Sequence, residues 1–490
     1  MRRPSTNLMT GACLVMMTWT AACAPVDHWR VFEIDLDQRI EQERARTSAA
    51  ELTDPSRMDT PGRASPIERA ADQGLLELSV EQAAVFALEN NPDLRVQQLN
   101  PLIAGAFEQI ERGVFDPELF AEAEWTEERA SQTDRATGSQ FAVVGEDSAV
   151  VGGVRQRLPT GTDIEATVEH DRTTSNRSPE QQTARLGLTV TQSLLRGFGP
   201  RVNLARVRQA ELNTIASVYE LRGFAEAVLA DTEITYWNYV LAREQIAIFE
   251  RSLVIAREQR DQVEQRIEVG VLARTEAAAA RAEVARREQA LITARSVMRE
   301  RRLRLLRLIS PEANGAFDLD IDAISSPRIE PEPITDLHDR LLLAERARPD
   351  LNEARLRLEE ARLETIVTRN GLLPRLELFI ALGKTGFDDK LTHAFKKLDD
   401  ETYDVTAGVR FSQVLGNRTA EGRDLAARAS TQQAARAINN LRQLVRFEVR
   451  LAANDVERAR QQIAASAVTR ALEEQTLEAE QQRFEVGAST

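Results

Sequence analysis

The second half of this chain repeats the order of motifs found in its first half. Three pairs of segments match, at offsets of 257, 221 and 217 residues. The pairs are Pro92-Asp93-Leu94 with Pro349-Asp350-Leu351, Leu188-Thr189-Val190-Thr191-Gln192 with Val409-Arg410-Phe411-Ser412-Gln413, and Arg266-Ile267-Glu268-Val269-Gly270 with Arg483-Phe484-Glu485-Val486-Gly487. A duplication of this extent restricts the fold to two similar supersecondary units within one chain.

Each unit contains segments in which apolar residues occupy every second position, which is the pattern of one face of a β-strand. One such segment follows Pro117 or Pro374, and a second precedes the long helix of the unit. The apolar positions are Leu119, Ala121, Ala123, Trp125, Leu186, Leu188 and Val190 in the first unit, and Leu376, Leu378, Ile380, Leu382, Ala407, Val409 and Phe411 in the second. The pattern predicts four strands, with a connecting loop that is 36 residues shorter in the second unit.

Very long helices are predicted at the end of each unit, over residues 202–268 and 418–485. At 1.5 Å per residue each would reach on the order of 100 Å, and such a helix needs partners along its whole length. The returning helix over 275–309 is only half as long. A second short helix over 337–371, broken near Pro349, would cover the other half. We therefore expect one long helix to face two stacked short ones.

The two units, over residues 76–309 and 336–490, are joined by a connector at 310–335 and differ at their ends. The first unit continues for about 39 residues beyond Gly270, whereas the second stops at Thr490, three residues after Gly487. We expect the second unit to lack its final helix. A fragment of a longer protein and a naturally shortened product both remain open.

The N-terminus carries an export signal. Arg2 and Arg3 precede a short apolar core, Gly11 to Ala22, which is too short to span a membrane, and Cys23 follows directly. This pattern resembles a bacterial lipoprotein signal and predicts a signal peptide over 1–22, lipidation of Cys23 and a lipid-anchored tether over 23–75. Simple cleavage after Ala22 is the alternative. The only other cysteine, Cys13, lies within the signal, so the mature chain has no internal disulfide.

Charge and hydropathy exclude several classes of protein. The formal net charge is −14, and no basic stripe with interleaved aromatic residues occurs, which argues against a nucleic-acid surface. No run of 18 or more apolar residues follows the signal. If the mature chain crosses a membrane, it must therefore do so as strands of a closed barrel.

Several of these segments resemble the TolC family of outer-membrane channels, over residues 76–490. The matching stretches are Leu78-Ser79-Val80-Glu81-Gln82-Ala83, Asn90-Asn91-Pro92-Asp93-Leu94, Ser193-Leu194-Leu195-Arg196-Gly197-Phe198-Gly199, and the two Arg-x-x-x-Gly turns that begin at Arg266 and Arg483. The resemblance implies a mainly α-helical protein with a small membrane β part. Three copies would each give four strands to a shared β-barrel, and long helical hairpins would form an α-helical tunnel in the periplasm.

The implied function is that of an outer-membrane channel in a tripartite efflux or type I secretion system. Such a channel conducts substrates passively from a periplasmic adaptor and an inner-membrane pump to the exterior, with outer-membrane lipid around it and no cofactor. The strand count agrees with assembly, because four strands cannot close a barrel and about eight are the minimum. A homotrimer is what the resemblance implies, and nothing in the pattern excludes two copies.

Two groups of residues are candidates for this function. The polar residues between the apolar strand positions would line the lumen, or they are simply solvated: Glu122, Glu124, Glu165, Thr167 and Glu169. The turns at the far tips of the helices would contact the adaptor, or their glycines merely permit a tight turn: Val269, Gly270, Val271, Leu272, Thr275, Val486, Gly487, Ala488, Ser489 and Thr490.

Other classes of protein fit less well. A lipidated periplasmic coiled-coil adaptor (a membrane fusion protein) predicts one hairpin between small β domains rather than a duplicated unit, and a coiled-coil tether needs no alternating strands. No catalytic motif is present. The histidines, His28, His170, His338 and His393, lack ligand spacing, so no metal site is predicted. The four lysines, Lys384, Lys390, Lys396 and Lys397, fall in one predicted loop, which either attracts anionic lipid headgroups or is simply solvated.

Overall fold

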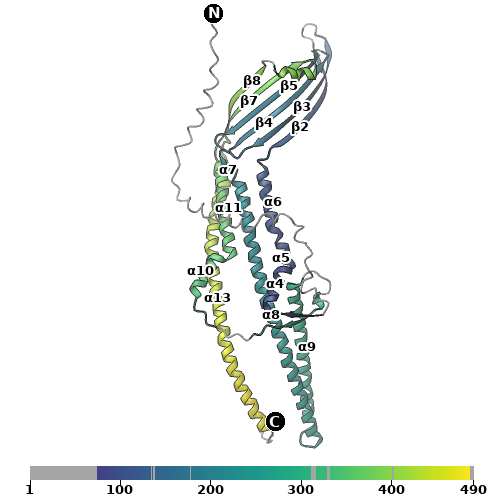
Figure 1. Ribbon diagram of the computed structural model, residues 1–490, viewed down its shortest axis with the longest axis vertical. Helices are drawn as coiled ribbons and strands as arrows, with labels where there is room; N and C mark the ends of the chain where they lie inside the picture. The colour runs from purple at the N-terminus through teal and green to yellow at the C-terminus, as the bar shows by residue number, and fades with distance from the viewer. Residues whose placement is uncertain are drawn as a thin grey trace. The chain divides into compact units, whose positions relative to one another are not determined.

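A computed structural model describes residues 74–485, apart from 134, 136–137, 177, 311–315, 328–331 and 400–401. The predicted signal peptide, Cys23, nearly all of the predicted tether and the tip residues Val486 to Thr490 lie outside the described residues. Elements carry the labels of Figure 1.

The long helices occur where the pattern predicts them. Helix α8 spans Ala205–Glu268 and α13 spans Arg418–Glu485, while α9 (Glu276–Ile309) returns beside α8 (Figure 1). Helices α10 (Leu337–Ala347) and α11 (Pro349–Gly371) follow one another along α13. The predicted pairing of one long helix with two shorter ones is confirmed for α8, because α9 packs against its second half and α11 against its first half, at Asn213 and Glu220. Pro349 makes the predicted break, because it begins α11 as its first residue.

The duplicated Pro-Asp-Leu motif begins a helix in both units. Asn91 caps α5 (Pro92–Gln97) by accepting a hydrogen bond from the backbone N–H of Leu94, and Leu94 is buried. In the second unit the same motif begins α11, and Leu351 is fully buried. Helices α4 (Val80–Asn90) and α6 (Leu99–Gly113) flank α5, and all three pack against α8.

The main core forms around a small parallel sheet of β1 (Leu75–Leu78) and β6 (Asp320–Ala323). Tyr236 of α8 is fully buried beneath it. Its hydroxyl donates to the carbonyl of Leu78 at 3.0 Å and accepts from the N–H of Ser325 at 3.1 Å. One side chain therefore ties the start of the first unit and the connector to the long helix.

The second sheet has six antiparallel strands in the order β2-β3-β4-β5-β7-β8 (Figure 1). They are β2 (Glu118–Thr133), β3 (Gln140–Arg157), β4 (Thr162–Ser175), β5 (Ser178–Ser193), β7 (Arg375–Asp388) and β8 (Tyr403–Ser412). The prediction of four strands is wrong for this sheet, because the supposed long loop of the first unit contains β3 and β4. Glycines and small polar residues weaken the alternation there, yet each strand pairs on both sides, and this supplies the missing stability.

A carboxyl cluster between α11 and α8 predicts a pH effect on stability. Burial and the neighbouring Glu220 raise the pKa of Glu353, although Arg357 lies 3.5 Å away. A raised pKa favours folding below the unfolded value, about 4.3, and that stability is lost as the pH rises through the folded value. We expect Glu353→Gln to raise the melting temperature at neutral pH and to lose this advantage below about pH 4. Glu478→Gln, on an exposed face of α13, should leave the melting temperature unchanged at both pH values. Equal effects of the two substitutions would contradict the raised pKa of Glu353.

Candidate functional site

The six-stranded sheet has one apolar face. The strand register places the alternating apolar residues of all six strands on the same side. Many of them are widely exposed, as Leu119 is at 82% and Val409 at 63%. The face consists of Leu119, Ala121, Ala123, Val150, Val154, Ile164, Ala166, Val168, Leu186, Leu188, Val190, Leu376, Leu378, Ile380, Leu382, Val405, Ala407, Val409 and Phe411. An exposed apolar face of this extent indicates contact with lipid or with protein.

Amphipathic aromatic residues mark one boundary of this face. Trp125 is 61% exposed, and its indole N–H donates to Glu146 at 3.0 Å, while Tyr403 is 76% exposed beside Lys384. Beyond Trp125 the same face becomes polar, since Arg172 forms an ion pair with Glu180 at 2.7 Å. Tryptophan and tyrosine at the edge of an apolar band, followed by charges, are typical of a membrane–water interface.

The opposite face of the sheet is polar and carries all five predicted lumen residues. Glu122 and Glu124 of β2 lie on the same side as Glu165, Thr167 and Glu169 of β4. Thr167 donates to Glu169 at 3.0 Å. Their shared side follows from the register, whereas their role as a lining remains a proposal.

A motif that is absent from the duplicated segments described above occurs on this polar face in both units. In the first, Arg155 forms a bidentate ion pair with Glu118, and its guanidinium lies 5.3 Å from the ring centre of Phe120. The ring covers Gly153, where any side chain would overlap it. In the second unit the equivalent residues are Glu377, Phe379, Gly408 and Arg410, with the guanidinium 5.5 Å from the ring centre.

The sequence does contain the signal for this motif. Glu118-Leu119-Phe120 recurs as Glu377-Leu378-Phe379, and Gly153-Val154-Arg155 recurs as Gly408-Val409-Arg410. Their offsets, 259 and 255, differ from the 257 set by the prolines and from the 221 used for the second strand. The structural equivalent of the hairpin β7–β8 is therefore β2–β3, and not the pair β2 and β5 that the sequence prediction aligned with it.

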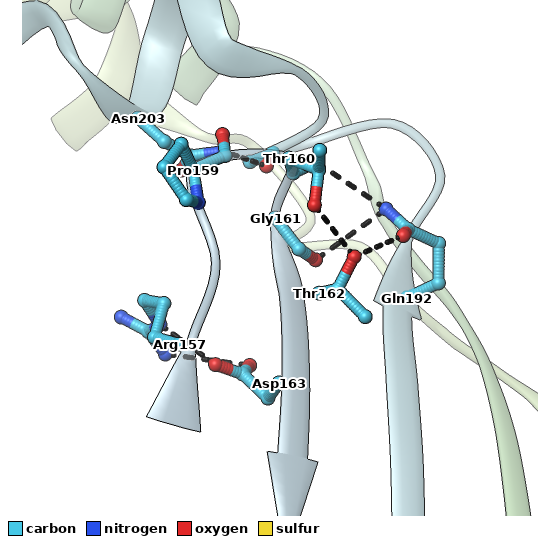
Figure 2. Close-up of polar contacts among 9 residues, drawn as sticks. Arg157, Pro159, Thr160, Gly161, Thr162, Asp163, Gln192 and Asn203 are labelled. Atoms are coloured by element: carbon cyan, nitrogen blue, oxygen red, sulfur yellow. Dashed lines mark hydrogen bonds and ion pairs between the residues drawn. The ribbon is translucent and has the colours of Figure 1, made fainter. Parts of the chain in front are cut away.

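The turn between β3 and β4 is attached to the start of the long helix (Figure 2). The side-chain amide of Asn203 donates to the carbonyls of Pro159, Gly197 and Gly199 at 3.0, 2.8 and 3.1 Å. Gly161 has a φ of +84°, and a side chain there would overlap the carbonyl oxygen of Gly197. The backbone N–H of Gly199 donates to the carbonyl of Thr160 at 3.0 Å.

Strand β5 completes this junction. The carboxamide of Gln192 accepts from the hydroxyl of Thr162 at 2.5 Å (Figure 2). The backbone N–H of Ser193 donates to the carbonyl of Gly161 at 3.0 Å. Arg157 and Asp163 form an ion pair at 2.8 Å across the same turn. The sequence prediction identified none of these contacts, because the turn lay within the supposed loop.

The described tip residues lie together at the turn between α8 and α9. Gly270 has a φ of +82°, and the N–H groups of Val271 and Leu272 donate to the carbonyl of Arg266 at 2.8 and 3.2 Å. Val269 and Val271 are 73% and 71% exposed. Two exposed valines on a tight turn are available for contact with a partner, and this contact remains a proposal.

The lysines are distributed differently from the prediction of a single loop. Lys384 lies within β7, Lys390 precedes the short helix α12 (Leu391–Lys396), and Lys397 lies 2.7 Å from Asp388. Helix α12 packs on β5 and β7, and its Ala394 is fully buried. His393 does gather with Asp388 and Asp389, their ligand atoms lying within 4.8 Å of one another. The ammonium group of Lys397 offsets the charge of one member of this cluster, Asp388.

Among the described residues, no helix is both long enough and apolar enough to cross a membrane.

A family model described as outer membrane efflux protein matches residues 85–310 and 341–490. No curated protein matches this chain.

Solved structures with the same fold include several outer-membrane channels. The CmeC outer membrane channel of Campylobacter jejuni is 17% identical with a TM-score of 0.61, and the match covers 88% of this chain and 81% of that one. VceC of Vibrio cholerae is 18% identical with a TM-score of 0.58, covering 84% and 87%. The open state of the MtrE outer membrane channel of Neisseria gonorrhoeae is 17% identical with a TM-score of 0.53, covering 84% and 80%.

Proposed function

Because the chain belongs to the outer membrane efflux protein family, we propose that it is the channel subunit of a tripartite efflux or type I secretion assembly. It is an outer-membrane channel, and the adaptor reading is not favoured. In the proposal, cargo passes from an inner-membrane pump and a periplasmic adaptor through the channel without being chemically changed. The observation that carries it is the six-stranded sheet with one apolar and one polar face.

The edges of this sheet argue for assembly from several copies. Strands β2 and β8 are the two ends of the strand order, and within the described part of the chain each pairs on one side only. Backbone groups of an open edge cannot be left unpaired in lipid, so the sheet must close with other copies. Since β2 and β8 run in opposite directions, β8 of one copy meets β2 of the next as an antiparallel pair. We propose a homotrimer, as the family resemblance implies.

The helices offer a second surface for assembly. One face of α6 packs against α8, whereas the other exposes apolar residues at intervals of three or four, which is the spacing of a helix-packing seam. These residues are Leu99, Ile103, Phe107, Ile110 and Val114. In a ring of copies they would be covered by a neighbouring subunit, and the helices together would enclose a periplasmic tunnel.

Two further contacts are proposed, one with outer-membrane lipid and one with the adaptor. Lipidation of Cys23 would anchor the chain to the outer membrane. Val269, Gly270, Val271, Leu272 and Thr275, with Val486 to Thr490, would contact the adaptor at the far tip. These assignments rest on the family resemblance and on the exposure of the valines in the α8–α9 turn.

The polar face predicts a cation-preferring pore. Glu122, Glu124 and Glu165 lie on that face, and replacing all three by Gln removes negative charge from the lumen. In reconstituted bilayers we expect the cation-over-anion permeability ratio to fall on the order of twofold at low salt, and less at high salt because of screening. The measurement is the reversal potential in a salt gradient.

The control is the double substitution Glu146→Gln and Glu180→Gln, which removes charge beyond the aromatic boundary of the apolar face and should leave the ratio unchanged. The detergent-extracted protein should have a native mass near three chains. A soluble monomer that gives no conductance in bilayers would overturn the proposed function.

A further inference from the structure

We infer that the hairpin β4–β5 is an addition that widens the membrane barrel without widening the helical tunnel, so that the exit does not select cargo by size. The inference rests on the proposed channel function and deepens it, because it assigns size selection to the helical part of the path.

The duplicated motifs identify which hairpin is the addition. The hairpin β2–β3 is equivalent to β7–β8 because both carry the motifs Glu-Leu-Phe and Gly-Val-Arg, which begin at Glu118 and Gly153 in the first unit. In both hairpins the Phe lies opposite the Gly and the Glu opposite the Arg. Strands β4 and β5 have no counterpart among the described strands of the second unit. The ends of β3 and β5 are also similar in sequence. Val154-Arg155-Gln156 in β3 resembles Val190-Thr191-Gln192 in β5.

The added strands are integral members of the sheet. Strand β4 pairs with β3 from Asp163 to Ser175, and β5 pairs with β7 from Gln182 to Ser193. The apolar face continues through Ile164, Ala166 and Val168 and then through Leu186, Leu188 and Val190. If β4 and β5 formed an outer loop folded over the sheet, they would not need apolar residues that continue this face. Strands β4 and β5 instead separate β3 from β7, which would otherwise be neighbours.

The hairpin adds strands but no helix. Chain passages between helix and sheet occur at α6–β2, β5–α7 (Pro200–Asn203), α11–β7 and β8–α13. The β3–β4 connection turns back within Leu158 to Gly161, where Asn203 holds the carbonyl of Pro159. The number of helices that face the sheet is therefore the same with or without the hairpin, while the number of strands rises by two per chain.

Strand number sets barrel width. The diameter of a barrel grows roughly linearly with the number of strands. With strands about 4.8 Å apart and tilted about 40°, eighteen strands give a backbone diameter of roughly 36 Å, against roughly 24 Å for twelve. Three copies of this sheet supply the larger number. The cross-section at the membrane then exceeds that of a twelve-stranded barrel by about twofold, whereas the tunnel is unchanged.

The test removes the hairpin in register. Deleting residues 158–193 joins Arg157 at the end of β3 to Leu194, the residue that follows β5, and brings β3 beside β7 in the same direction as β5. Neutral polyethylene glycols of graded radius are added to one side of single channels in bilayers, and the smallest excluded radius is measured. The control replaces residues 391–399 by a Gly/Ser linker, which alters the outer connection without changing the strand number.

The deletion is expected to change the excluded radius on one side of the membrane only. For polymers added on the outer side, the deletion should lower the excluded radius by about a third, and for polymers added on the periplasmic side it should change nothing. The linker control should match the full chain on both sides. For polymers added on the outer side, an excluded radius that is the same for the full chain and the deletion would overturn the inference.

Direct imaging covers the case in which the deletion does not fold. Cryo-electron microscopy of the full chain in detergent should show six strands per copy in the barrel wall. Four strands per copy, with β4 and β5 outside the wall, would overturn the inference while leaving the channel intact. Absence of any conductance from the full chain would instead count against the proposed function.

Discussion

Leu188→Arg should prevent stable insertion of the sheet, whereas Thr189→Arg, one residue later, should be tolerated. Leu188 lies in the middle of the apolar face between Ala166 and Leu382, while the side chain of Thr189 points to the opposite face. An arginine on the lipid face of a barrel costs about 2–4 kcal/mol near the midplane of the bilayer. In an assembly of identical copies every subunit carries this cost.

The measurement is urea unfolding of the protein refolded into lipid vesicles, followed by tryptophan fluorescence and by resistance of the oligomer to heat in detergent. The neighbouring position is a strict control, because both variants add the same side chain to the same strand. Equal stability of the two variants would show that the apolar face does not contact lipid. A loss caused only by Thr189→Arg would exchange the assignments of the two faces.

Tyr236→Ala should have the largest effect outside the membrane part. The side chain is fully buried in the main core, and its hydroxyl bonds the carbonyl of Leu78 and the N–H of Ser325. Truncation of a buried aromatic ring costs about 3–5 kcal/mol. Tyr236→Phe keeps the ring but removes both hydrogen bonds, at about 1–3 kcal/mol. The half-buried N–H of Ser325 then loses its partner, whereas the carbonyl of Leu78 keeps the N–H of Ile324 at 3.1 Å. The melting temperature of the purified protein should therefore fall in the order wild type, Phe, Ala.

Tyr219→Phe is the matched control, because this tyrosine of α8 is only half-buried and lies outside that core. It should leave the melting temperature unchanged. If Tyr236→Phe matched wild type as well, the hydrogen bonds that fasten β1 and the connector to α8 would contribute nothing measurable. The effect of Tyr236→Ala would then be attributable to packing alone.

The helical part of the fold was predictable because its signals are local. The glycine turn at Gly270, the proline at Pro349 and the periodicity of residues 418–485 each fix one boundary, and the structure places α8, α9, α10, α11 and α13 within a few residues of the predictions. Once the two ends of a long, regular helix are known, few other secondary-structure assignments fit the residues between them.

The strand count was wrong because sheet stability is not local. Gly152 and Gly153 interrupt the alternation of β3, and the polar residues of β4 resemble a loop when they are considered alone. In the sheet, Gly153 is the space that Phe120 fills, and the polar residues of β4 occupy a face that all six strands share. Such a reason for a glycine becomes visible only when the partner strand is known.

The alignment of the two units failed for a related reason. The prolines at 117 and 374 gave one offset, but Phe120 and Phe379 are displaced from it by one pleat, which is two residues. A shift of two residues keeps each side chain on its own face, so the apolar alternation did not reveal the error in the alignment. The contacts of Arg155 and Arg410 with the two rings correct the alignment.

The uniform antiparallel order of the sheet also limits how such a chain can change during evolution. A single extra strand would leave the chain on the far side of the membrane, away from α8, and would make the two edges parallel. A hairpin returns the chain to the side it left, as the turn at Gly161 does, and keeps the edges compatible with the proposed contact between copies. Descendants of this architecture can therefore gain or lose strands only two at a time. The hairpin is the smallest heritable step in the size of its pore.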